Sequence, residues 1–161
     1  MFFAAILLGV AQAILPASDA DLSRRLTSEA EELLRLEKKV AAAENGLDAV
    51  LYEDVLALLD AALRANPQNL HARVVSSDVL LLKANDGDGT YDVCTLLDAR
   101  DEAEFVTSRA SRASESDLAA ARAVLRSIDS IPPAAVPDPP SSCDEEDERH
   151  PGSRASAAKA R

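Results

Sequence analysis

An acidic loop near the middle of the chain holds the residues whose spacing comes closest to a chemical site. Residues 86–92 read DGDGTYD, and Gly89 fits the sharp turn of a twelve-residue calcium-binding loop. The aspartates then take the third, fifth and ninth ligand positions: Asp86, Asp88 and Asp92. The same register puts Ala84 first and Thr95 twelfth, where calcium needs a monodentate Asp and a bidentate Glu, so about three coordinating oxygens are missing. We therefore expect a solvated connection between two helices here and no metal site.

Catalytic and cofactor-binding motifs do not occur in the sequence. The chain has two histidines, His71 and His150, and neither belongs to a His-x-x-x-His or His–Cys cluster that would hold a metal ion. No serine lies in a Gly-x-Ser-x-Gly elbow, and no Gly-Lys-Ser/Thr loop is present to bind phosphate. We therefore predict a protein that is not an enzyme and that uses no cofactor and no metal.

The charge balance argues against nucleic acid as a partner. Lys and Arg number 17 against 28 Asp and Glu, so the 161-residue chain has a formal net charge of -11. A surface this acidic repels phosphate backbones. The acidic run at 144–148 favours solubility, with docking to a basic partner as the alternative reading.

The N-terminal segment has the features of an export signal. A short apolar run from Phe2 to Val10 is followed by Ala11-Gln12-Ala13, which supplies the small residues that signal peptidase requires. We expect cleavage after Ala13, with Ala17 and Ala20 as alternatives. The run is shorter than the ~20 apolar residues that cross a bilayer, so no stable membrane span should remain. The mature protein is then expected in the secretory pathway or outside the cytoplasm, as a lumenal, periplasmic or secreted protein. If the segment is instead a buried first helix, the protein is cytoplasmic.

Export would bring the two cysteines into an oxidising compartment, where they either pair or stay as single thiols. Cys94 falls in an expected helix and Cys143 in an expected tail, so a disulfide would pin the tail to the helices. Their spacing matches no metal-binding or redox motif. Pairing between them therefore stays open at this point.

Composition predicts an all-α fold. Hydrophobic residues make up 47% of the chain but aromatic residues only 3%, and there are five glycines, too few for the turns of an all-β domain. A heptad-like apolar stripe marks a first helix that Ser18 and Asp21 would cap: Leu22, Leu26, Leu33, Leu36, Val40, Ala43 and Leu47. Apolar stripes predict four more helices, at about 47–62, 70–83, 93–106 and 118–128, the last one capped by Ser114 and Asp117.

Turn residues separate these helices and divide the chain into domains. Asn45-Gly46, Asn66-Pro67 and the loop from Asn85 to Thr90 supply the breaks. Residues 18–131 then form one helical domain. Pro132-Pro133 ends the fifth helix, and the Pro-rich and acidic segment 132–161 is expected to be a disordered tail, because it cannot bury enough apolar surface.

Part of the second and third helices resembles the tetratricopeptide repeat family. The family has a Tyr, a small residue, a large apolar residue, Ala and Pro at fixed intervals, and five residues have the matching spacing: Tyr52, Val55, Leu59, Ala62 and Pro67. The small Ala62 lets two antiparallel helices approach closely, and Pro67 turns the chain into the next helix. Four positions of that next helix depart from the family pattern: Arg73, Ser76, Ser77 and Leu80. An ordinary helical hairpin is the alternative.

The resemblance implies a right-handed array of antiparallel hairpins that binds a protein or peptide and has no catalytic role. In this family the first helices of successive repeats line the concave surface. The polar residues of helix 70–83 that are expected to face the partner are Arg73, Ser77 and Asp78, with Arg73 the main candidate because a guanidinium binds carboxylates bidentately. The alternative is a structural subunit of a larger assembly or a homodimer, joined through the Leu22–Leu47 stripe. The sequence leaves the oligomeric state open.

Overall fold

The computed structural model describes residues 18–44, 49–85, 89–136 and Cys143. Regular structure in these residues is helical and comes in the following order: α1 (Asp19–Glu44), α2 (Ala49–Ala65), α3 (Leu70–Ala84), α4 (Val93–Thr107), α5 (Glu115–Asp129) and a 3₁₀ turn, η1 (Pro133–Ala135). The prediction of an all-α array of about five helices is confirmed for this part of the chain. The expected signal segment and the expected Asn45-Gly46 turn lie outside the described residues.

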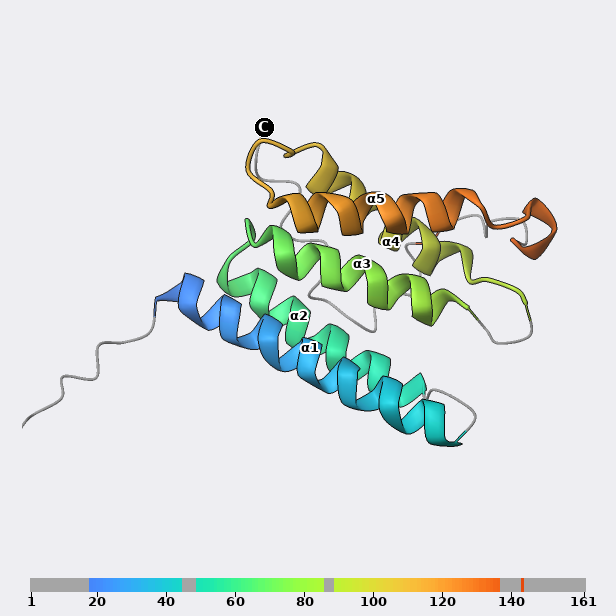
Figure 1. Cartoon of the computed structure of the whole chain (residues 1–161), viewed down its shortest axis with the longest axis horizontal. Helices are drawn as coiled ribbons and strands as arrows, with labels where there is room; N and C mark the ends of the chain where they lie inside the picture. The colour runs from blue at the N-terminus through green and yellow to red at the C-terminus, as the bar shows by residue number, and fades with distance from the viewer. Residues whose placement is uncertain (1–17, 45–48, 86–88, 137–142, 144–161) are drawn as a thin grey trace, which may run out of the picture.

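The helices form two layers. Figure 1 shows α1, α3 and α5 side by side, with α2 and α4 behind them. Each hairpin, α1–α2 and α3–α4, pairs one helix of the front layer with one of the back layer, while α3 also contacts α1 and α5 within its own layer. Helices that alternate along the chain therefore share one face of the molecule.

The helix starts follow simple capping chemistry. Ser18 and Ser114 accept hydrogen bonds from the backbone N–H groups of Asp21 and Asp117, both at 3.1 Å, so the two capping pairs expected from the sequence are confirmed. Asn69 caps α3 through its bond from the Ala72 N–H at 3.1 Å. Short polar side chains stabilise helix starts in this way because the first N–H groups of a helix have no intrahelical partner.

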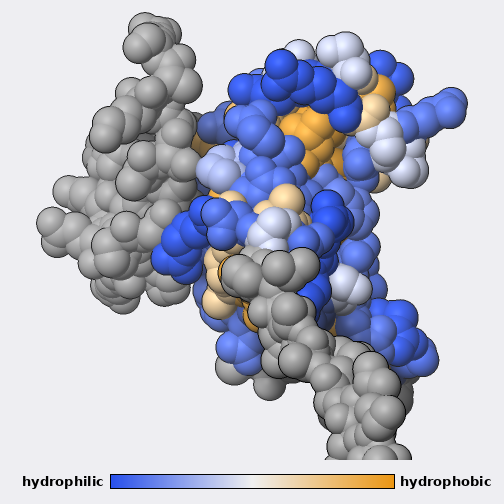
Figure 2. All heavy atoms as spheres, turned by 90° about the vertical axis from the view of Figure 1, so that its left-hand side faces the viewer, coloured by the Kyte–Doolittle hydropathy of each residue, from blue (hydrophilic) through white to orange (hydrophobic). Residues whose placement is uncertain are grey.

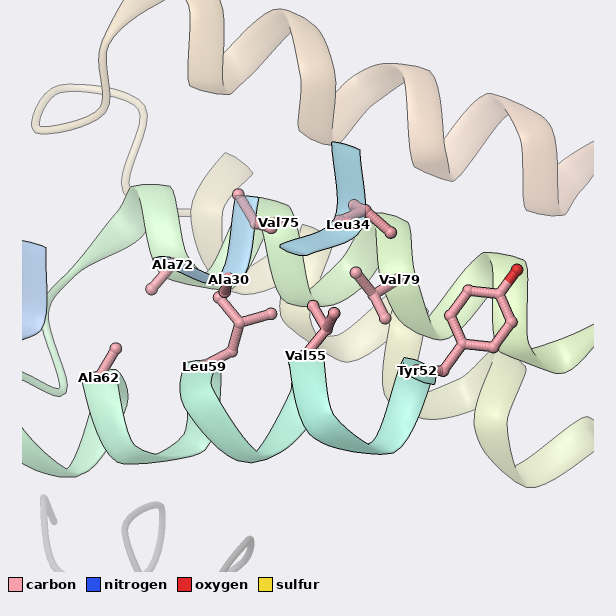
Figure 3. Packing of buried hydrophobic residues seen from close by; sticks show 9 residues of the cluster. All are labelled: Ala30, Leu34, Tyr52, Val55, Leu59, Ala62, Ala72, Val75 and Val79. Carbon is pink, nitrogen blue, oxygen red and sulfur yellow. The ribbon is translucent and has the colours of Figure 1, made fainter. Parts of the chain in front are cut away.

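Two apolar clusters form the core. The first joins α1, α2 and α3 and is shown in Figure 3: Ala30, Leu34, Tyr52, Val55, Leu59, Ala62, Ala72, Val75 and Val79. The second joins α3, α4 and α5: Leu70, Val74, Ala103, Val106, Ala121 and Val124. Alanines at the contacts let the helices approach closely. Figure 2 shows that apolar atoms reach the surface at one end of the molecule only in small patches between hydrophilic side chains.

The central helix α3 belongs to both clusters. Ala72, Val75 and Val79 enter the first cluster, whereas Leu70 and Val74 enter the second. Burial on two sides of one helix explains why the apolar residues of α3 are not confined to a single stripe. The orientation of α3 thus sets the position of everything on either side of it.

The buried face of α1 lies one residue away from the stripe that the sequence predicts. Leu22 and Leu36, two members of that stripe, are 42% and 45% exposed. The buried residues are Ser23, Thr27, Ala30 and Leu34, and Leu26 and Leu33 lie half-buried beside them. A pattern of apolar residues does not identify this buried face, because two of its four buried side chains are polar.

Those buried polar groups form a junction around Asn69. The Asn69 amide Nδ2 donates to Ser23 Oγ at 2.8 Å and to Thr27 Oγ1 at 3.1 Å. Ser23 Oγ in turn donates to the Ala62 carbonyl of α2 at 2.7 Å. One side chain in the α2–α3 turn therefore binds α1, caps α3 and reaches α2 through a serine, with every buried hydroxyl satisfied.

Replacing Asn69 with alanine should destabilise the protein by about 1–3 kcal/mol, because it removes the α3 cap and leaves buried hydroxyls with fewer partners. Urea unfolding followed by circular dichroism measures the loss. Gln68→Ala, one residue away and exposed, is the matched control and should change the free energy of unfolding by less than about 0.5 kcal/mol. Equal effects of the two substitutions would contradict the junction.

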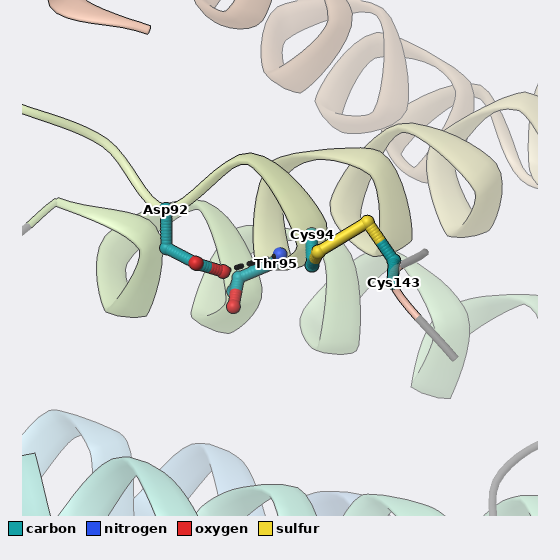
Figure 4. The surroundings of a disulfide bond; sticks show 4 residues. All are labelled: Asp92, Cys94, Thr95 and Cys143. Atoms are coloured by element: carbon teal, nitrogen blue, oxygen red, sulfur yellow. Dashed lines mark hydrogen bonds between the residues drawn. A yellow bond between two sulfur atoms is a disulfide. The ribbon is translucent and has the colours of Figure 1, made fainter. Parts of the chain in front are cut away.

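The C-terminal part of the described chain is held against α4. The Tyr91 N–H donates to the Ala135 carbonyl at 3.0 Å, and Cys94 forms a disulfide with Cys143, with 5.4 Å between their Cα atoms (Figure 4). The helical domain thus extends to Val136, beyond the boundary expected at Ile131. The expectation of a free tail from residue 132 is wrong for this stretch, because it forms a 3₁₀ turn whose Ala135 carbonyl accepts the N–H of Tyr91. The remaining tail residues lie outside the described part of the chain.

Candidate functional site

A groove of about 770 Å³ opens between α1, α3 and α5. Its floor is apolar and is built by buried residues of all three helices: Leu34, Val74, Val75 and Val124. The spacing of the α3 residues that line the groove, at positions 71, 74, 75, 78 and 81, places them on one face of the helix. The groove therefore lies on the face that the alternating helices share.

The two walls of the groove differ in chemistry. On α1 the wall carries three cations, Arg35, Lys38 and Lys39, whose spacing of three and four residues brings them to one side of the helix. Arg35 pairs with Glu32, and Lys38 lies 3.5 Å from Asp78 of α3. On α5 the wall consists of small residues: Ala120, Ala123 and Ser127. A basic wall faces a small, neutral one in a chain whose net charge is strongly negative.

His71 lines the groove and contacts both walls. Its Nδ1 lies 2.8 Å from Asp117 Oδ1 on α5, and its Nε2 lies 3.1 Å from Glu31 Oε1 on α1. Burial of the ring lowers the pKa of His71, but the hydrogen bond to Asp117 and the charges of Glu31 and Asp117 outweigh it, so the pKa lies above its ordinary 6.5. Burial also raises the pKa of Asp117, yet its bonds to Ser114 and His71 bring the pKa below the ordinary value.

The raised pKa of His71 predicts a pH-dependent stability. A group whose pKa is higher in the folded state stabilises the fold fully below its unfolded pKa of about 6.5, and this contribution is lost as pH rises through the higher folded value. The free energy of unfolding should fall over that window in the wild type. His71→Gln, measured by urea unfolding at the same pH values, should show a flatter profile. Parallel profiles for the two proteins would refute the ion pairs.

Arg73 does not face the groove, so its expected place on the partner-facing side is wrong. Its side chain is only 13% exposed and turns towards α4, where Nη1 lies 2.7 Å from Glu102 Oε2. The guanidinium also donates to the Pro67 carbonyl at 3.2 Å and lies over the Phe105 ring, 3.8 Å from its centroid. A cation with three internal partners holds the α3–α4 hairpin together.

Arg73→Ala should cost about 1–3 kcal/mol of stability, because Glu102 is then left three-quarters buried without its cation. Burial already raises the pKa of Glu102, and the charge of Arg73 only partly offsets this. The matched control is Arg122→Ala on the exposed face of α5, which should change stability by less than about 0.5 kcal/mol. An unchanged thermal midpoint for Arg73→Ala would contradict the assignment of Arg73 as a structural residue.

The other predicted contact residues have separate outcomes. Ser77 is fully buried and donates to the Val74 carbonyl at 2.8 Å, so the prediction that it faces a partner is wrong. The reason is that α3 is covered on both sides, which leaves only the narrow face towards the groove. Asp78 does line the groove. Of the three predicted contact residues, only Asp78 lies on the face of α3 that lines the groove.

The acidic loop does not gather its aspartates in the described structure. Asp92 caps α4 by accepting the Thr95 N–H at 2.7 Å, as Figure 4 shows, and so serves a structural role. Asp86 and Asp88 lie outside the described residues. Among the residues that are described, no group of three His, Cys, Asp or Glu side chains is arranged to hold a metal ion.

Sequence reasoning missed most of the groove. From the sequence, His71 was considered only as a metal ligand. The alternation of helices along the chain was a signal that α1, α3 and α5 would share a surface, but it did not specify the residues. Comparison with family models, curated proteins and solved structures finds no match. What the groove can bind therefore has to be inferred from the residues that line it.

Proposed function

We propose that the protein is a non-catalytic interaction module that holds a segment of a partner protein in the groove between α1, α3 and α5. The observation that carries this proposal is the groove itself, an apolar floor with one basic wall, built by alternate helices. The resemblance of residues 52–83 to the tetratricopeptide repeat family is in line with the proposal, because an array of that kind would provide such a groove. Grooves of this kind accept apolar side chains at helical spacing.

The chemistry of the walls selects an amphipathic segment that carries a carboxylate. Apolar side chains of the segment pack on Leu34, Val74 and Val124, and a carboxylate beside them reaches Lys39 on the rim of α1. The small residues of α5 leave room for the backbone of the segment. Acidic residues in the segment are favoured, because their negative charge is complementary to the cations of the α1 wall.

The compartment we propose is the secretory pathway or the exterior of the cytoplasm. The disulfide between Cys94 and Cys143 supports this, because disulfides persist in oxidising compartments. Cleavage after Ala13 or Ala17 would keep the Ser18 cap of α1, whereas cleavage after Ala20 would remove it. None of the helices in the described ranges has both the length and the apolar character needed to cross a bilayer.

A structural subunit is the second candidate, and the exposed leucines of α1 favour it. Leu22 and Leu36 present apolar surface on the side of α1 away from the first core cluster. A partner helix, or a second copy of the chain, would cover them. A subunit of this kind would assemble whether or not the groove is open.

Filling the groove should abolish peptide binding. Peptides are selected on the immobilised full chain from a random display library, and those enriched should combine apolar positions at helical spacing with Asp or Glu. Ala123→Arg places a long side chain in the groove and should weaken these peptides at least about tenfold. The matched control is Ala119→Arg, an exposed α5 position outside the groove, which should leave affinity unchanged.

Either of two results would overturn the groove function. One is that no peptide is enriched, and the other is that Ala123→Arg and Ala119→Arg bind peptides equally well. Enrichment of peptides together with concentration-dependent assembly that Ala123→Arg leaves intact would favour the structural subunit as an additional role.

A further inference from the structure

One side chain joins the two walls of the groove. His71 projects from the first turn of α3 and contacts Glu31 of α1 with one ring nitrogen and Asp117 of α5 with the other. The three residues come from the three helices that form the groove. In the described residues α1 and α5 both pack against α3 and not against each other, so the ring bridges two walls that are not neighbours in the fold.

The number of N–H donors on the His71 ring decides which protonation state this geometry requires. Ionised carboxylates only accept hydrogen bonds, so a ring that serves two of them must donate from both nitrogens. A neutral imidazole carries one N–H, whereas an imidazolium carries two. The bridge between Glu31 and Asp117 is therefore complete only when His71 is protonated.

No other charged group in the described residues competes for the ring. From α1 the charge that acts on His71 is Glu31, and from α5 it is Asp117. Two cations of the groove, Arg35 and Lys38, pair with Glu32 and Asp78 instead. From α2 and α4, which pack on the other faces of α3, no charged side chain has a resolved effect on the ring. A change in the protonation of His71 therefore acts mainly on its contacts with Glu31 and Asp117.

We propose that His71 is a proton-operated latch that ties the α1 wall of the groove to the α5 wall, and that its release weakens the binding of acidic segments. The second half of this proposal rests on the proposed function of the groove. The first half concerns the groove alone and needs no partner.

The contacts also determine which wall is released. Asp117 is 14% exposed, lies closer to the ring and is held by the Ser114 hydroxyl at 2.6 Å. Glu31 is 45% exposed and has the longer bond. When the ring loses one proton, the remaining N–H stays on Nδ1 facing Asp117, and the lone pair on Nε2 then repels the Glu31 carboxylate. The α1 wall moves away, and Glu31 adds an uncompensated negative charge to the groove.

The separation of the walls can be measured directly. Spin labels are attached at two exposed positions outside the groove, through Ser28→Cys on α1 and Ala119→Cys on α5, with the native disulfide kept intact. Pulsed electron resonance then gives the distance between the labels below and above the pKa of His71. We expect the distance to increase on the order of 1–2 Å as the ring is deprotonated.

Glu31→Gln is the discriminating control. Its amide accepts from the protonated ring and donates to the Nε2 lone pair of the neutral ring, so the walls should stay together at both pH values. His71→Gln should also remove the pH dependence. A distance in the wild type that does not change while the His71 ring titrates, followed by nuclear magnetic resonance, would overturn the latch.

Affinity for the selected acidic peptides tests the regulatory half. It should fall several-fold in the wild type as pH rises through the same window and stay constant in Glu31→Gln. Constant affinity in the wild type would overturn regulation by the latch. If no peptide binds at any pH, the proposed function fails, whereas a pH-dependent wall distance would still support the latch.

Discussion

The amide of Asn69 fixes how the first hairpin meets α3, beside the apolar contacts of the first core cluster. It binds two hydroxyls on α1, accepts the Ala72 N–H at the start of α3 and reaches α2 through Ser23. Hydrogen bonds are directional, so they specify a single arrangement where apolar contacts alone would tolerate sliding. The Asn-Pro turn of the sequence thus does more than reverse the chain, because it sets the angle at which α3 leaves α2.

The position of α3 then determines the groove. Apolar residues on two sides of α3 are buried in the two core clusters, and Arg73 and Ser77 are used inside the fold, which leaves one face between α1 and α5. On that face Val74 and Val75 form the floor, and His71 bridges the walls. Because most of the surface of α3 is buried, the side chains that can still contact a ligand lie in a narrow strip of this helix. The groove proposed as an interaction surface and the contacts of His71 across it therefore come from the same constraint.

The architecture could be predicted from the sequence because helix-forming stripes and capping pairs are local signals. Ser18 and Ser114 cap the helices that they were expected to cap, and the helix bounds follow the apolar patterns closely. Which face of α1 is buried could not be predicted, because Ser23 and Thr27 are buried through bonds to a residue more than forty positions away. Arg73 was assigned to the surface for the same reason, since its partners Glu102 and Phe105 lie on another helix. Pairings between distant segments carry no signature in a single sequence.

The Asn69 junction should be fully formed in solution, and amide hydrogen exchange at Ala72 is a direct test of this. The N–H groups in the first turn of a helix have no intrahelical partner and normally exchange quickly. The Ala72 N–H, however, donates to Asn69 Oδ1 in a part-buried setting. We therefore expect this amide to exchange as slowly as amides in the middle of α3, such as that of Val79. Exchange at the rate of an exposed first-turn amide, such as that of Ser116 in α5, would contradict it.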